Sequence, residues 1–352
     1  MEGYNKKVIM SYWTICRMKT TKKIYVKVSI IFLLGGILLF SSCEKEENQK
    51  IEANRKTLFM YLPWSSNLTN YFYNNISDLE KCITKIGLNN EKVIVFISTG
   101  STEAMMFEIV SSHGRCKREI LKKYKSPPFT TIDGITAILN DVKAFAPASV
   151  YTMIIGCHGM GWLPVYEMKV RSAPHMKMHW EYQGVPLTRY FGGLTAEYQT
   201  DIKSLASGIA NAGMKMEYIL FDDCYMSSIE VAYELKDVTK YLIGSTSEMM
   251  AYGMPYAAIG EYLLGNPDYQ SGCEEFYNFY STYEIMPCGT LAVTDCSELE
   301  NMAAIIKSIN SKYSFDKSLR GTIQRLDGYT PVIFYDFADY ITSLCNDPIL
   351  LN

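Results

Sequence analysis

A histidine and a cysteine each follow an apolar run that is typical of a buried strand. The run VYTMIIGC is followed directly by His158 and Gly159, and two residues separate the run MEYILF from Cys224. A thiol with a pKa of about 8.5 is only a few per cent thiolate near neutrality, and a nearby imidazole can activate it or protonate the leaving amine. If the two strands are neighbours, we expect His158 and Cys224 to form the dyad of a cysteine hydrolase. The alternative is a hydrogen-bonded imidazole and a buried thiol with structural roles only.

Gly159 adds an expectation about the oxyanion that forms during such a reaction. A glycine leaves room beside the reacting carbon, because it has no side chain. We expect its backbone N–H, together with that of Cys224, to donate hydrogen bonds to the developing oxyanion.

Apolar runs alternate with helix-period segments along the chain, which predicts an α/β fold around a mostly parallel sheet that is covered on both faces. The expected strands are residues 57–62, 92–97, 150–157, 216–221, 241–245 and 290–294. The expected helices are residues 68–86, 132–145, 202–212, 227–235, 274–283 and 299–312. Segments 105–110 and 119–121 are expected to form a small hairpin, with its turn near His113, and Asp336 and Asp339 to cap or begin a further helix. Sites in open parallel sheets form at the carboxyl ends of the strands, where His158 and Cys224 lie.

The first 42 residues have the layout of a signal peptide. Lysines precede a largely apolar run at residues 28–40, which is too short to span a bilayer, and Met18 would begin a more ordinary leader. The run LFSSC resembles a bacterial lipobox, in which Cys43 would be lipidated. The acidic stretch after it resembles the tether of Bacteroidetes lipoproteins. We therefore expect a signal peptide over residues 1–42, a lipidated tether over 43–54 and a catalytic domain over 55–352.

Charge and ligand spacing exclude two classes of function. Without the leader the chain has 27 basic and 36 acidic residues, which disfavours nucleic acid as a partner because phosphates require Lys and Arg clusters. His175 and His179 have a helical metal-ligand spacing, but no third ligand accompanies them. We therefore predict no metal site.

Four segments together resemble the clostripain family of cysteine peptidases, in the clan of caspases, legumains and gingipains. They are TLFMYLP, IIGCHGMGW, ILFDDCYMSSIEVAYELKDVTKYLIGSTSE and FYDFADY, and the similarity runs over residues 57–340. The resemblance implies a caspase-like α/β/α sandwich and a His158/Cys224 dyad that acts through a thioacyl-enzyme. It implies cleavage after Arg or Lys, assigned to the acidic residue two positions before the cysteine, here Asp222. It also implies that no cofactor is needed for the chemistry, with calcium as a candidate activator.

This chain departs from the family pattern beside the cysteine. The residue before the catalytic cysteine is usually small, and here it is Asp223, which leaves open whether Asp222 or Asp223 lines the specificity pocket. Glu248 is a further candidate for a pocket acid. The apolar ending at residues 348–352 suggests a truncated domain. The rival hypothesis is a non-catalytic lipoprotein of the same fold that binds peptides or a protein partner.

Self-processing is expected between Trp162 and Thr195, because the resemblance implies self-cleavage between the histidine and cysteine strands, as in several family members. This segment has no strand pattern, and exposed loops are the usual sites of nicking. The candidate cleavage sites are Lys169, Arg171, Lys177 and Arg189. We thus predict an exported endopeptidase, lipid-anchored to the bacterial outer membrane, whose partners are protein or peptide substrates and the membrane.

Overall fold

An eight-stranded sheet forms the centre of the protein in the computed structural model, which describes residues 54–65, 67–163, 165, 196–329, 332–345 and 347. Its order is β4-β3-β2-β1-β5-β6-β7-β8. The strands are β1 (Asn54–Leu62), β2 (Glu91–Gly100), β3 (Glu103–Ser112), β4 (Arg115–Lys125), β5 (Ala148–Ile155), β6 (Met216–Phe221), β7 (Thr239–Gly244) and β8 (Ala292–Asp295).

The five inner strands β2, β1, β5, β6 and β7 run parallel to one another. Their side chains are mostly buried, as expected for parallel strands with both faces covered. Antiparallel strands complete both edges, with β3 and β4 on one side and β8 on the other. The predicted hairpin is confirmed but longer than expected, and its two-residue turn places His113 and Gly114 at positive φ.

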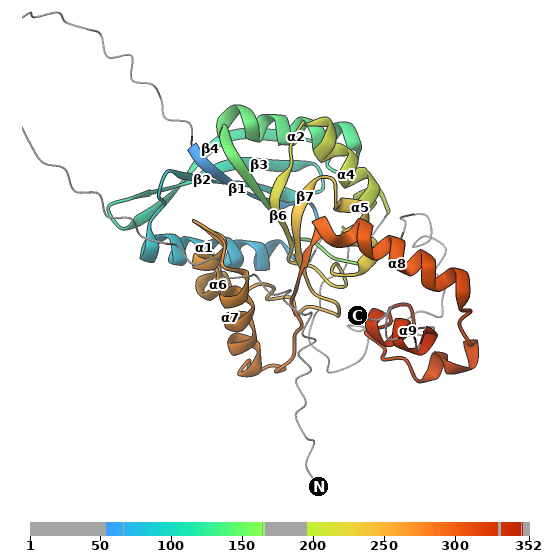
Figure 1. Cartoon of the computed structure of the whole chain (residues 1–352). Coiled ribbons are helices and arrows are strands. Elements are labelled where there is room, and N and C mark those ends of the chain that lie inside the picture. The colour runs from blue at the N-terminus through green and yellow to red at the C-terminus, as the bar shows by residue number, and fades with distance from the viewer. Residues whose placement is uncertain are drawn as a thin grey trace, which may run out of the picture. The chain divides into compact units, whose positions relative to one another are not determined.

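Helices cover both faces of the sheet, which confirms the predicted α/β/α sandwich (Figure 1). One layer contains α2 (Ile132–Phe145), α4 (Ile202–Asn211) and α5 (Ile229–Leu235). The other contains α1 (Thr69–Ile86), α6 (Tyr256–Leu263) and α7 (Tyr269–Ser281). Outside these layers lie α8 (Leu299–Lys312) and α9 (Phe337–Leu344), and the side chain of Asp336 caps α9 as predicted.

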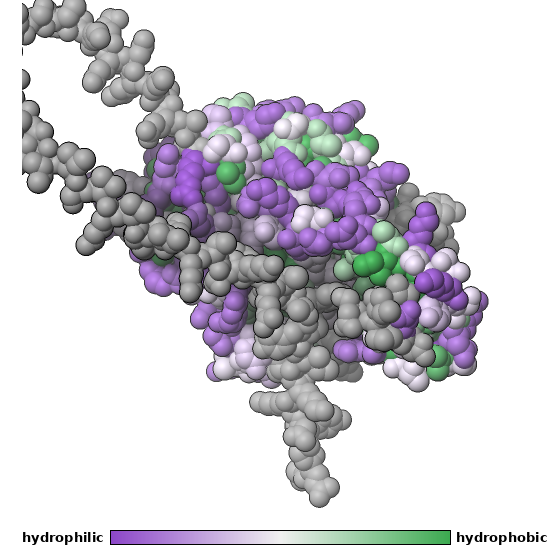
Figure 2. All heavy atoms as spheres, viewed as in Figure 1, coloured by the Kyte–Doolittle hydropathy of each residue, from purple (hydrophilic) through white to green (hydrophobic). Residues whose placement is uncertain are grey.

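The surface of the described residues is mostly hydrophilic in the view of Figure 2, and its hydrophobic side chains are scattered. Trp162 is one of the few large apolar side chains exposed among the described residues. Single exposed apolar residues are normal for a folded protein. None of the helices in the described part of the chain has the length and apolar character needed to cross a bilayer.

Candidate active site

Two neighbouring parallel strands deliver His158 and Cys224 to the same edge of the sheet. Ile155, the last residue of β5, is in register with Phe221, the last residue of β6. His158 and Cys224 each lie three residues beyond this pair. The backbone N–H of Asp222 donates to the carbonyl of Ile155 at 2.8 Å, so the ladder continues into the two loops. The adjacent loops at the carboxyl ends of β5 and β6 therefore carry His158 and Cys224 at equivalent positions.

Gly159 is the point where the two loops touch. A Cβ on Gly159 would lie 2.1 Å from the carbonyl oxygen of Cys224 and 2.8 Å from its backbone nitrogen. Because no side chain fits at these distances, only glycine allows the histidine loop to pass so close to the cysteine loop. The backbone groups that we expect to hold an oxyanion are thus next to each other.

The Cys224 side chain is buried and is held by a contact with the backbone of Met249. It is fully buried, and its Sγ accepts the backbone N–H of Met249 at 3.2 Å. The following residue, Tyr225, has a φ of 59°, a left-handed conformation that is uncommon for a residue with a large side chain. The Cys224 sulfur also lies 3.7 Å from the Met249 carbonyl oxygen, to which the thiol donates, so the backbone of Met249 holds the Cys224 side chain through both of its polar groups.

His158 is also buried, with 1% of its surface exposed, and its Nε2 lies 2.8 Å from Oδ1 of Asn67. Sequence reasoning missed Asn67. A signal existed, because β1 pairs with β5 and the polar residues that follow β1 must therefore reach the same edge of the sheet.

The two neighbouring aspartates point to different loops. The Asp222 carboxylate accepts the Met254 backbone N–H at 2.8 Å and the Tyr256 hydroxyl at 3.0 Å. The Asp223 carboxylate accepts the Cys157 backbone N–H at 2.5 Å, and its other oxygen lies 3.4 Å from the Cys157 sulfur. Asp222 therefore contacts the loop after β7, whereas Asp223 contacts the loop that carries the histidine.

Glu248, the third acidic candidate, is half-buried and accepts the Tyr225 hydroxyl at 2.9 Å. Burial raises the pKa of Tyr225 far above its ordinary value, and the Glu248 charge adds to this shift. The Tyr225 hydroxyl therefore keeps its proton and remains a donor. Glu248 is thereby tied to the residue that follows Cys224.

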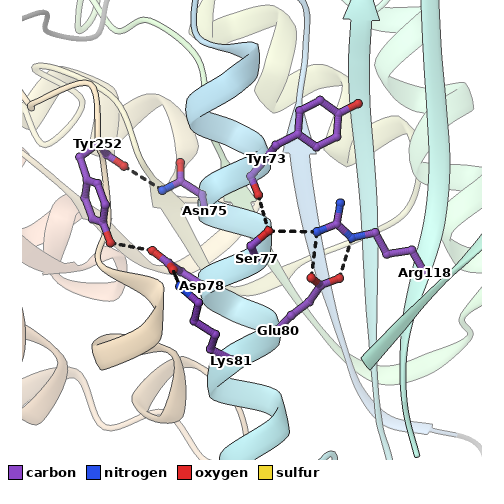
Figure 3. A network of polar contacts seen from close by, with 8 residues as sticks. All are labelled: Tyr73, Asn75, Ser77, Asp78, Glu80, Lys81, Arg118 and Tyr252. Atoms are coloured by element: carbon purple, nitrogen blue, oxygen red, sulfur yellow. Dashed lines mark hydrogen bonds and ion pairs between the residues drawn. The ribbon is translucent and has the colours of Figure 1, made fainter. Parts of the chain in front are cut away.

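Helix α1 fixes the loop that contacts Cys224 and Asp222. Asn75 donates to the carbonyl of Tyr252 at 2.8 Å, and the Tyr252 hydroxyl donates to Asp78 at 2.6 Å (Figure 3). Further along the same helix, Glu80 pairs with Arg118 of β4 (Figure 3). The helix is thus bonded to the Met249–Met254 loop at one side and to the edge hairpin at the other.

A segment near the C-terminus packs against both loops of the site. The Phe334 ring stacks on Tyr225 at 4.4 Å between centroids and 6° between planes. The same ring would lie 2.7 Å from a Cβ on Gly161, in the histidine loop. The Tyr329 hydroxyl lies 3.4 Å from the sulfur of Met160. Aromatic side chains of this segment thus touch one loop through Tyr225 and the other through Gly161 and Met160.

Several predicted residues lie outside the described residues, so the structure does not place them. They are Cys43, His175, His179, Lys169, Arg171, Lys177 and Arg189. Within the described ranges, no three His, Cys, Asp or Glu side chains are grouped in a way that could hold a metal ion.

The sandwich fold, with a histidine loop and a cysteine loop at adjacent strand ends, defines a caspase-like cysteine protease. A model of the clostripain family matches residues 60–346, so the chain belongs to that family and is a cysteine endopeptidase. The resemblance noted in the sequence is thereby confirmed.

The chain is similar to several solved structures. A secreted C11 cysteine protease from Bacteroides thetaiotaomicron, "iotapain", is 59% identical, with a TM-score of 0.78, over 85% of this chain and 82% of that one. A clostripain from the same species, bound to the peptide inhibitor BTN-VLTK-AOMK, is 70% identical, with a TM-score of 0.45, over 46% of this chain and 72% of that one. An inactive zymogen C11 protease from Parabacteroides distasonis has the same fold at 24% identity, with a TM-score of 0.69, over 84% of this chain and 79% of that one. No curated protein sequence matches the chain.

Proposed function

We propose that His158 and Cys224 are the catalytic dyad of an endopeptidase that cleaves after Arg or Lys. One observation carries this proposal. The histidine loop and the cysteine loop begin after residues that are paired in register on neighbouring strands, and the two loops touch at Gly159. The thiol of Cys224 lies in the loop beside the histidine loop, and a cysteine next to an imidazole is the arrangement that nucleophilic catalysis requires.

The reaction follows from these groups. The Cys224 sulfur attacks the substrate carbonyl carbon after passing its proton to His158, and the oxyanion accepts the N–H groups of Gly159 and Cys224. His158 then protonates the leaving amine, the C–N bond breaks and a thioester remains. Water attacks the thioester with His158 as the base, which releases the acid and restores the thiol.

Asp222 is our choice for the acid that recognises the basic side chain of the substrate. Its carboxylate is buried and contacts the Met254–Tyr256 region, and Met249, nearer the start of that loop, contacts the Cys224 sulfur. The two other acids are engaged with parts of the site itself, because Asp223 binds the Cys157 N–H and Glu248 binds Tyr225. A buried carboxylate at this position would favour binding of the guanidinium group of a substrate Arg or the ammonium group of a substrate Lys.

The dyad is tested by Cys224→Ala, His158→Ala and the double variant, assayed on a peptide with a basic residue before the scissile bond. We expect each single variant to lose at least about 10³-fold in kcat, with the double barely worse, because residues acting as one unit are not additive. Cys296→Ala is the matched control, since this buried cysteine near β8 is remote from the loops and burial raises its pKa to about 11. Wild-type turnover in Cys224→Ala would reject the dyad, and an inactive but folded wild type would favour the rival binding protein.

We further propose self-processing after Lys169, Arg171, Lys177 or Arg189. The burial of His158 and Cys224 supports it, because a peptide reaches the thiol only after surrounding residues move. Intact mass should show a cut after one of these residues in the wild type and none in Cys224→Ala. A fully active, uncut chain would contradict self-processing and leave the dyad unaffected.

Export and lipidation at Cys43 complete the proposal. The similarity to a protease described as secreted supports export, and the lipobox-like LFSSC supports the anchor. A clickable fatty acid should label the wild type and not Cys43→Ser. Equal labelling of both would reject the anchor.

A further inference from the structure

The contact between Asn67 and His158 bears on which nitrogen of the imidazole carries the proton. Asn67 Oδ1 lies 2.8 Å from Nε2 of His158. An amide oxygen only accepts hydrogen bonds, so the nitrogen that faces it must be a donor. In the neutral ring only one nitrogen is protonated, and Nδ1 is then the basic atom.

The start of helix α1 holds Asn67 in place. Asn67 comes directly before Leu68 and Thr69, where the helix begins, and Leu68 is fully buried. The backbone N–H of Phe72, itself buried, donates to the Leu68 carbonyl at 3.0 Å. Farther along, α1 is bonded to Tyr252 and to Arg118, as Figure 3 shows. The amide is therefore presented by an element that is anchored to the rest of the site.

We propose that Asn67 is a positioning residue for the reaction, which keeps His158 in the Nε2–H tautomer and leaves Nδ1 to exchange the proton with Cys224. This rests on the proposed function of the dyad. The thiol proton of Cys224 passes to Nδ1, which gives a thiolate and an imidazolium whose Nε2–H remains bonded to the amide oxygen. The same Nδ1 proton is given to the leaving amine, so the ring does not have to rotate between the two steps.

The kinetic test compares Asn67→Leu with Asn67→Asp. Leucine is similar in size but has no acceptor, whereas aspartate keeps an oxygen in the same place. We expect Asn67→Leu to lose about tenfold or more in kcat with KM within about twofold, since the amide acts on the ring and not on the peptide. Asn67→Asp should stay within about threefold of the wild type. Asn301→Leu, at an exposed asparagine of α8 whose amide contacts only its own helix neighbour Glu298 in the described structure, is the matched control.

A spectroscopic test reads the tautomer without any turnover. Histidine labelled with ¹⁵N in Cys224→Ala should give the pattern of a ring protonated at Nε2 above neutral pH, with His158→Gln assigning the signal. Adding Asn67→Leu should shift this signal toward the Nδ1–H form. An unchanged tautomer together with an unchanged kcat in Asn67→Leu would overturn the proposal. If the wild type cleaves no peptide, the dyad function fails, and the tautomer signal alone still decides the role of Asn67.

Discussion

At the scale of single residues, Asp222 and Asp223 are adjacent and buried, yet each serves a different neighbour. Asp222 accepts bonds from the loop after β7, and Asp223 accepts the N–H of Cys157 next to the histidine. A substitution at Asp222, the acid proposed for the specificity pocket, should change which substrates are cleaved. One at Asp223 should change how well the histidine loop is held.

We predict that Asp222→Asn lowers kcat/KM for Arg peptides by about 30-fold to several thousand-fold, the cost of leaving a desolvated charge unpaired. Peptides with Leu before the scissile bond should lose far less. Asp223→Asn should lower kcat/KM for Arg, Lys and Leu peptides by a similar factor, and so serves as the control for a general loss. Selective loss of Arg cleavage in Asp223→Asn would move the pocket acid by one residue.

The residues of the site differ in how far the sequence could predict them. His158, Gly159 and Cys224 closely follow apolar runs, so their position at strand ends was visible, and the two loops touch at Gly159 in the structure, while the dyad itself stays a prediction. Asn67 was missed because it lies before a helix and its partner is 91 residues away, and only the pairing of β1 with β5 shows that the residues after β1 reach the same edge. The different directions of Asp222 and Asp223 depend on side-chain contacts that no sequence period encodes.

At the scale of elements, the segment around Phe334 packs its rings on the two loops that meet at the active site. Since Phe334 stacks on Tyr225 and abuts Gly161, it couples the cysteine loop to the histidine loop. Tyr225 in turn donates to Glu248. Removal of this ring should therefore disturb the proposed dyad as well as the stability of the fold.

We predict that Phe334→Ala lowers kcat by about tenfold or more. It should also lower the free energy of unfolding by about 3 to 5 kcal/mol, as is usual when a buried ring is removed. Phe334→Tyr should retain most of the activity, because the ring and its stacking remain. Phe315→Ala is the control, since Phe315 packs on Tyr340 in a separate small cluster. Equal losses of kcat in Phe334→Ala and Phe315→Ala, measured well below both unfolding midpoints, would contradict the coupling.

Among the elements, the inner strands were predicted closely because their apolar runs are continuous. Helix α6 was not predicted, and packing explains why: a Cβ on Gly260 would lie 2.9 Å from the Cys82 sulfur, so close contact with α1 demands a glycine inside the helix. Glycine weakens the helical signal in the sequence. The β3–β4 hairpin is also longer than predicted, because polar side chains at an exposed sheet edge hide the strand pattern.

At the scale of the whole molecule, a lysine is buried where the central strand enters the protein. Lys56 of β1 is 3% exposed and donates to the carbonyls of Leu263 and Gly265 at 2.6 and 3.0 Å. Burial lowers the pKa of Lys56 to about 8, and the nearby Glu91 carboxylate only partly opposes this shift. An ordinary lysine in the unfolded chain has a pKa of 10.5. Between pH 8 and 10.5 the unfolded chain therefore binds more protons at this residue, so the contribution of Lys56 to the free energy of unfolding rises with pH.

We predict that the free energy of unfolding of the wild type, relative to Lys56→Met, increases by about 1 to 3 kcal/mol between pH 8 and 10. Urea unfolding of both proteins across this range measures the difference. Lys240→Met is the control, because the hydrogen bond to Glu217 raises the pKa of the exposed Lys240 and gives the opposite, small dependence. A difference between wild type and Lys56→Met that is constant or falls with pH would contradict the prediction.

The pairing of β5 with β6 has a consequence for what a cut between them would produce. The two strands are neighbours in one sheet, and α2 packs on α4 across the same division of the chain. A cleaved protein should therefore remain a single particle of two polypeptides under native conditions, although denaturing electrophoresis would separate them. For the same reason, halves made as separate chains, one ending after β5 and one beginning before β6, have the surfaces required to reassemble around the His158 and Cys224 loops.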